Sequence, residues 1–211
     1  RRVVARPQQS MTRAAAVTAY RLISGAVLAG AITLCVAAWH LGTERTGRAT
    51  AYFYEVFDIG HPGIVNAVTS MALVAVATIS VMLGLSTGLT PWLVNAALFL
   101  VLAADNVLRL HNIVPAGDVI ARLVYWAVLA WLLVRLRPLL VGARGGPLLI
   151  LGLALLAAGE LLDVIGNDGH HAAAVFEEAL GCVGAWALAM ACVGVAMSTL
   201  TAVTPEPPVP G

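Results

Sequence analysis

The sequence predicts an all-α membrane protein, a bundle of six transmembrane helices. Of its 211 residues, 60% are hydrophobic and only 11% are charged, whereas soluble domains carry about 25% charged residues. The charged residues are bunched, which leaves long apolar stretches between them. A single soluble core could not enclose so much apolar surface, but a lipid bilayer can accept it.

Six stretches approach the roughly 20 mostly apolar residues that a helix needs to cross a bilayer. The expected spans are residues 18–40, 64–85, 91–110, 118–134, 147–165 and 172–197. Together they form a transmembrane domain over residues 18–199. The first span is long enough to be a retained helix and not a cleaved signal peptide. A basic segment, 1–17, precedes this domain, and a Pro-rich tail, 200–211, is expected to be disordered.

The arginine distribution predicts that both termini are cytoplasmic, because cytoplasmic loops are enriched in basic residues. Five arginines precede or open the first span and three lie between the fourth and fifth spans, on the same side of a six-span bundle. All twelve basic residues are arginine, which, with the richness in Ala, Val, Leu and Gly, is typical of a high-GC bacterial genome. We therefore expect the cell membrane of a bacterium.

Several function classes find no support in the sequence. The net charge of +1 gives no signature of nucleic-acid binding. The three cysteines each lie in an apolar run without ligand spacing, which is typical of core residues. The chain has no GxSxG, HExxH, P-loop or GxGxxG motif. Whether the protein is an enzyme therefore stays open.

Ionisable residues inside spans are costly and usually mark function. Asp105, Arg109 and Asn112 fall at i, i+4 and i+7 and share one helical face. Further charged residues open the fourth span, close the fifth and open the sixth. The expected polar cluster consists of Asp105, Arg109, Asn112, Arg122, Glu160, Asp163, Glu177 and Glu178.

Three of these carboxylates are expected at one depth. Asp105, Glu160 and Glu178 each lie about six residues inside the outer end of their span, or ~9 Å at about 1.5 Å per residue. They should converge inside the bundle, because facing lipid would be too costly. The layer has a surplus of about three negative charges, which a low dielectric cannot leave uncompensated.

Three interpretations follow. The cluster could be a structural network of arginine–carboxylate pairs that organises the bundle or an interface with a membrane-protein partner or a second copy. It could bind a cation or divalent metal, as in a metal-dependent membrane enzyme, through Asp105, His111, Glu160 and Glu178. It could also line a substrate or proton pathway in a small transporter. A polar outer half beside an apolar inner half argues against a continuous path.

Four stretches carry a resemblance: FDIGHPGIVNAVTS, AADNVLRLHN, AAGELLD and FEEALGCVG. The chain resembles an uncharacterised family of small bacterial multi-spanning proteins with an Asp-Glu…Leu-His-Glu motif in one span and a Glu-Glu pair opening the last. Asp105 and His111 match this motif, but Asn106 and Asn112 stand where the family has Glu. The loss of two carboxylates weakens a metal site. The resemblance implies the architecture and no particular activity.

Overall fold

The computed structural model describes residues 7–44, 64–108, 117–166 and 171–203. These residues form six helices and, within the described ranges, no strand. In chain order they are α1 (Pro7–Glu44), α3 (Ile64–Thr87), α4 (Thr90–Leu108), α5 (Gly117–Leu140), α6 (Gly146–Gly166) and α7 (His171–Val203). The all-α prediction is confirmed. Of the expected Pro-rich tail, 200–211, residues 200–203 belong to α7, and the rest lies outside the described residues.

Five of the six helices contain a stretch long and apolar enough to cross a membrane. These stretches are Ala14–Ala37, Ile64–Thr87, Thr90–Leu108, Val119–Leu140 and Val175–Thr199. In α6 the apolar stretch is shorter, Gly146–Leu162. The protein is therefore a multi-pass helical membrane protein with five clear spans. The sixth span and the cytoplasmic placement of the termini stay predictions.

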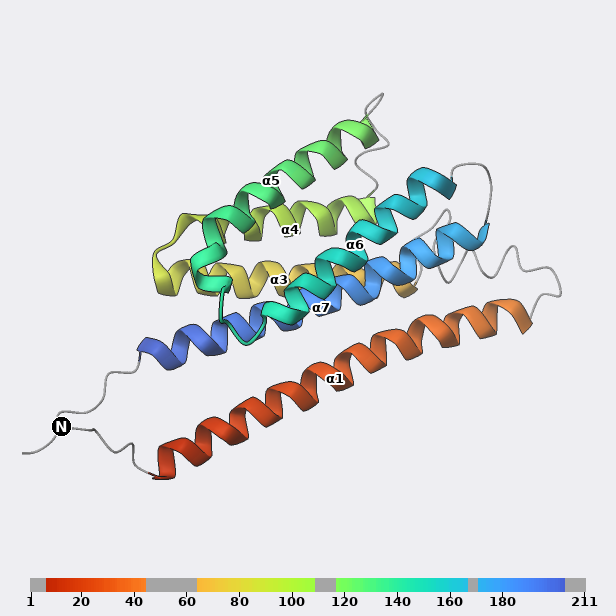
Figure 1. The fold of residues 1–211 in the computed structure, drawn as a ribbon. Helices are drawn as coiled ribbons and strands as arrows, with labels where there is room; N and C mark the ends of the chain where they lie inside the picture. Colours follow the sequence, from red (N-terminus) through yellow and green to blue (C-terminus); the bar gives the residue numbers. More distant parts are fainter. Residues whose placement is uncertain (1–6, 45–63, 109–116, 167–170, 204–211) are drawn as a thin grey trace, which may run out of the picture.

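Helices α1, α5 and α7 extend well beyond their expected spans, and α7 continues to Val203. Helix α1 begins at Pro7, in the polar N-terminal segment, because polar residues end an apolar run without ending a helix. Helix α5 continues past residue 134 to Leu140, through two arginines and Pro138. The ribbon changes direction near the end of α5 (Figure 1), as expected where proline removes a helical hydrogen bond. Gly142, with φ of 82°, turns the chain towards α6.

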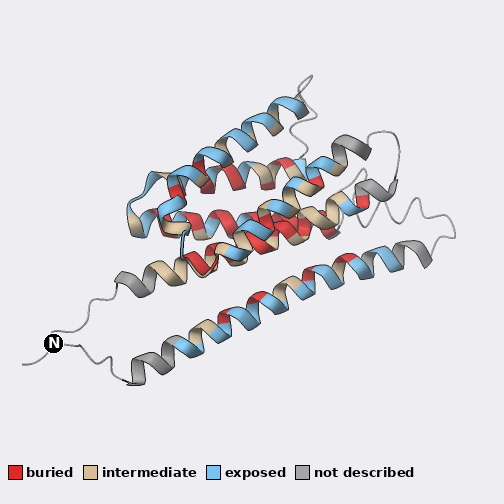
Figure 2. Ribbon diagram, viewed as in Figure 1, coloured by how far each residue is buried: buried red, intermediate tan, exposed pale blue. Residues whose placement is uncertain are grey.

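Successive helices run antiparallel, so the start of α1 and the end of α7 lie at the same end of the bundle (Figure 1). The most extensive contacts join α6 to α7 and α3 to α4, and α3 packs on α7 to unite the two pairs. Helices α1 and α5 flank this centre on opposite sides, with α1 along α7 and α5 beside α4. About half of the apolar stretches of α3 and α7 is buried, against only 11% of that of α5. Figure 2 shows the same contrast.

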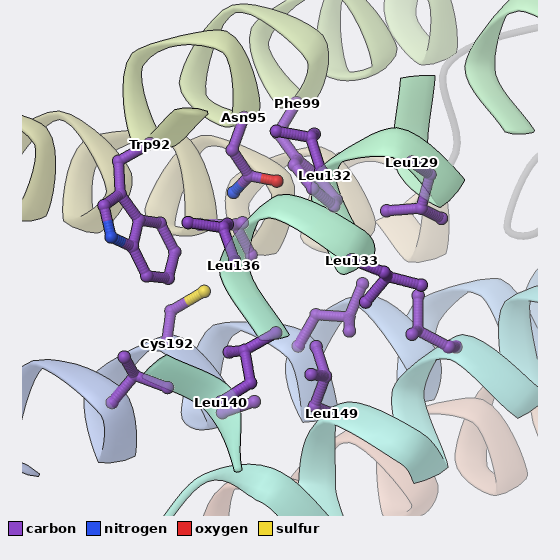
Figure 3. A pocket seen from close by; sticks show the side chains of 15 residues that line it. Trp92, Asn95, Phe99, Leu129, Leu132, Leu133, Leu136, Leu140, Leu149 and Cys192 are labelled. Atoms are coloured by element: carbon purple, nitrogen blue, oxygen red, sulfur yellow. The ribbon is translucent and has the colours of Figure 1, made fainter. Parts of the chain in front are cut away.

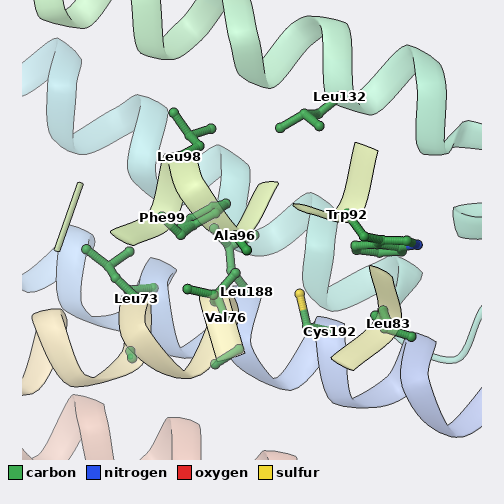
Figure 4. Packing of buried hydrophobic residues seen from close by; sticks show 14 of the residues in the cluster. Leu73, Val76, Leu83, Trp92, Ala96, Leu98, Phe99, Leu132, Leu188 and Cys192 are labelled. Atoms are coloured by element: carbon green, nitrogen blue, oxygen red, sulfur yellow. The ribbon is translucent and has the colours of Figure 1, made fainter. Parts of the chain in front are cut away.

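The apolar core lies between α3, α4 and α7, and α5 contributes two buried leucines to it, Leu132 and Leu136, with other α5 residues packed against it. Figure 4 shows Leu73 and Val76 of α3 meeting Phe99 of α4 and Leu188 of α7. One polar pair sits within this core: the Asn95 side-chain amide donates to Ser80 Oγ at 2.8 Å, and Ser80 Oγ donates to the Val76 carbonyl at 2.7 Å. In this pair the amide nitrogen and the hydroxyl are thus satisfied where no water can reach them.

Glycines spaced seven residues apart let α6 approach α7 closely. Gly145, Gly152 and Gly159 recur on one face, and a Cβ at Gly152 would lie 2.9 Å from the Gly184 carbonyl oxygen. Lipid supplies no hydrophobic drive between helices, so such backbone proximity is a main source of their association. Gly184 of α7 completes this contact, because a Cβ there would lie 3.1 Å from the Gly152 carbonyl oxygen. A Cβ at Gly181 would meet nothing within 4 Å.

We expect Gly152→Ala to destabilise the protein by about 1–3 kcal/mol, the usual cost of overpacking. The added methyl group would meet the Leu188 side chain as well as the α7 backbone. Gly30→Ala in α1 is the matched control, because its Cβ would meet nothing within 4 Å. Thermal unfolding in a maltoside detergent measures both variants. Equal midpoints for Gly152→Ala and the wild type would contradict the packing described for α6 and α7.

Candidate functional site

A cavity of about 360 Å³ opens into the polar end of the bundle, the end at which α3, α5 and α7 begin and α4 and α6 finish. All of these five helices contribute to its walls. Its polar lining consists of Asn66, Thr69, Asp105, Asn106, Arg122, Tyr125, Glu160, Glu177 and Glu178. The remaining walls are apolar and include leucines, Phe99 and Trp126.

Helix α5 presents a single stripe to the cavity. Arg122, Tyr125, Trp126 and Leu129 line it and fall at i, i+3, i+4 and i+7, which places them on one helical face. The stripe starts with a charge and becomes apolar two turns later. Leu123, on another face of α5, is 67% exposed. In its first turns the helix therefore directs its polar groups inward, which is expected where the alternative is lipid, whereas Arg135 and Arg137 near its other end are exposed.

Every Asp or Glu whose side chain the structure describes lines this cavity: Asp105, Glu160, Glu177 and Glu178. Arg122 is the arginine among the lining residues, so four carboxylates and one guanidinium leave three negative charges if all ionise. Asp105 is the most buried of the four acidic residues, with 8% exposure. The acidic surplus expected of this layer is thus concentrated around one cavity.

Charged groups of the cavity contact side chains on neighbouring helices. Arg122 Nε lies 3.5 Å from Glu160 Oε2, and these side chains are 28% and 46% exposed. The Tyr125 hydroxyl donates to Asp105 Oδ2 at 3.4 Å, which is long for a hydrogen bond of this type. Partly exposed or long contacts such as these hold side chains loosely. The carboxylates are therefore grouped around a space that the five helices enclose.

Asn106 fastens the wall formed by α3 and α4. Its side-chain amide donates to Ser70 Oγ at 2.8 Å and to the Asn66 carbonyl at 3.1 Å. Next to it, the Thr69 hydroxyl donates to the Val65 carbonyl of its own helix at 2.8 Å. Where a carboxylate was expected from the resemblance, this chain therefore has an amide that ties two helices together.

The structure brings five of the eight expected cluster residues to the cavity: Asp105, Arg122, Glu160, Glu177 and Glu178. Arg109 and Asn112 lie outside the described residues, and the side chain of Asp163 in α6 is likewise not described. Of the proposed metal ligands, His111 also lies outside. Among the described residues, no group of three or more His, Cys, Asp or Glu side chains could hold a metal ion. Metal binding therefore stays a prediction.

Asn66, Thr69, Asn106 and Trp126 line the cavity but were absent from the predicted cluster. Asn66 and Thr69 stand at i and i+3 in the first turns of α3, a spacing that places them on one face. This polar face lies at the same end of the bundle as the acidic residues, so the sequence does contain a pattern that indicates its place in the cavity wall. Uncharged amides and hydroxyls are common in spans as helix-packing groups, so ionisable residues alone do not point to this face.

A second, smaller cavity of about 40 Å³ lies deeper in the bundle and is almost wholly apolar (Figure 3). Leucines of α5, such as Leu132 and Leu136, face Leu149 of α6 and Cys192 of α7 across it. Phe99 and Leu129 line both cavities. The polar cavity is thus followed, along α5, by apolar and incompletely filled space.

Comparisons with protein-family models, with characterised proteins and with solved structures find no match for this chain. The resemblance drawn from short motifs stays a prediction.

We expect Asn106→Leu to lower the free energy of unfolding by about 1–3 kcal/mol, since it leaves the buried Ser70 hydroxyl without this donor. Val107→Leu is the matched control, because Val107 is the next residue and is 48% exposed. Thermal unfolding in maltoside compares the two variants. If Asn106→Leu is as stable as Val107→Leu, the amide does not hold α3 and α4 together.

Proposed function

We propose that this protein is a multi-pass membrane protein that binds a positively charged ligand in the cavity at the polar end of its bundle. The observation that carries the proposal is the cavity itself, about 360 Å³ walled by four carboxylates and one arginine. A cation placed there would offset the surplus negative charge, which is otherwise costly in a low dielectric.

The open volume favours binding over a purely structural network. Charged groups that serve only to fix helix positions are expected to pack against each other, as protein interiors are close-packed. Here the space would hold on the order of ten water molecules at about 30 Å³ each, and the Arg122–Glu160 contact is only partly covered. Water can solvate the carboxylates in the empty state, and a cationic ligand would replace that water.

The shape of the interior favours a binding site over a through-path. The neighbouring cavity of about 40 Å³ shares Phe99 and Leu129 with the polar one and is walled mainly by leucines. An ion crossing the bundle would need polar partners along its whole route. In the walls of the smaller cavity the polar side chain is Asn95, whose amide donates to Ser80.

Binding of protonated ethylamine to the purified protein in maltoside tests the proposal. We expect Asp105→Asn to weaken binding at least fivefold, because it removes a negative charge from the cavity wall. Arg122→Gln removes the competing cation and should strengthen binding. A folding defect would weaken binding in both variants, so opposite effects of the two substitutions identify charge as the cause. Isothermal titration calorimetry provides the measurement, with manganese(II) chloride as a second titrant.

Failure of the wild type to bind either titrant would overturn the proposal. Manganese binding that Asp105→Asn abolishes, without amine binding, would instead support the metal site of the sequence prediction.

A further inference from the structure

We infer that the ligand is an amphiphile whose amine head sits among the carboxylates and whose apolar tail lies along α5. This inference rests on the proposed function and specifies the chemical class of the ligand. It depends on three features of the structure: the change from polar to apolar walls within one cavity, the apolar space that follows it, and the loose packing of α5.

The walls of the cavity change character with depth. On α4, Asp105 and Asn106 line it near the end of the helix, whereas Leu98 and Phe99 line it about two turns deeper, or ~10 Å at about 1.5 Å per residue. On α5 the order along the chain is Arg122, then Leu129. On both helices the polar groups thus lie towards the polar end and the apolar groups towards the bundle centre. An amphiphile in a bilayer has the same polarity gradient.

The polar part of the cavity suits an amine. Its four carboxylates outnumber its one arginine, and Tyr125 and Trp126 place aromatic rings in the same wall. Aromatic faces attract ammonium groups, most strongly where the cation is partly desolvated. An anionic head would meet the carboxylates with a single arginine to oppose them, so charge complementarity selects a positively charged head.

The apolar part of the cavity would be poorly used by a small hydrophilic cation. Leu73, Leu98, Leu102, Leu129 and Leu156 all line it. Filling these walls with water is unfavourable, whereas covering them with a hydrocarbon tail is favoured in proportion to the apolar area buried. The smaller apolar cavity beyond Phe99 and Leu129 extends the same environment along α5.

Helix α5 leaves room for such a tail. Its contacts with α4 are far fewer than those that join α3 to α4 or α6 to α7. Its outward residues, such as Leu123 at 67% and Val134 at 72% exposure, are apolar and suited to lipid. A helix held this loosely between lipid and a cavity can accommodate a tail with small displacements, whereas the glycine-packed α6–α7 pair cannot.

The test uses the full chain in maltoside micelles, with bound molecules counted by native mass spectrometry. Three probes separate head from tail: dodecylamine, ethylamine and dodecanol. Leu129→Trp enlarges a side chain in the apolar wall, and Leu123→Trp places the same substitution on an outward face of the same helix. Leu156→Trp repeats the test from the α6 wall if Leu129→Trp does not fold.

We expect Leu129→Trp to weaken dodecylamine binding at least tenfold and to change ethylamine binding less than twofold, while Leu123→Trp changes neither. Dodecanol should bind at least tenfold more weakly than dodecylamine. If Leu129→Trp and Leu156→Trp leave dodecylamine binding unchanged, or weaken both amines equally, the tail assignment is wrong although the cation site stands. If dodecanol binds as tightly as dodecylamine, the charged head is irrelevant and the proposed function fails as well.

Discussion

The constraint that shapes this bundle is the cost of placing charge in a low dielectric. Four carboxylates lie on spanning or near-spanning helices, and the structure gathers all of them with Arg122 around one cavity. Isolated on separate lipid-facing surfaces, each would be strongly unfavourable. Grouped around a space that water or a cation can enter, they can be solvated or neutralised together, and Arg122 offsets one of the four charges. Keeping that space open is therefore a constraint on how the helices pack.

Different contacts hold the two sides of the cavity. Glycines bring α6 and α7 into backbone contact, and the Asn106 amide ties α4 to α3. These tight pairs form a firm frame. Helix α5 completes the wall with few contacts, so the cavity is preserved where a fully packed fifth helix would close it. The protein therefore combines precise packing with one loosely held element, and the cavity lies where the two meet.

The sequence predicted the features that depend on local periodicity. Apolar run lengths located the helices, and helical spacing with equal depth pointed to Asp105, Glu160 and Glu178, which all line the cavity. Features set by contacts between helices were harder to predict. Gly181 and Gly184 look equivalent in the sequence, and a Cβ at Gly159 of α6 would lie 3.8 Å from the Gly181 nitrogen. Yet an added Cβ would meet α6 only at Gly184. The sparse contacts of α5 with its neighbouring helices correspond to no pattern in its local sequence.

The most direct test of this account is whether water reaches the acidic layer. Gly181 lines the cavity and has open space around its missing Cβ, whereas its neighbour Cys182 is fully buried with 0% exposure. The other native cysteines, Cys35 and Cys192, are buried too. In Gly181→Cys, a charged, membrane-impermeant thiosulfonate should modify one thiol per chain, and in the wild type it should modify none. An unreactive Cys at position 181, or equal labelling of the wild type, would contradict an open polar cavity in this bundle.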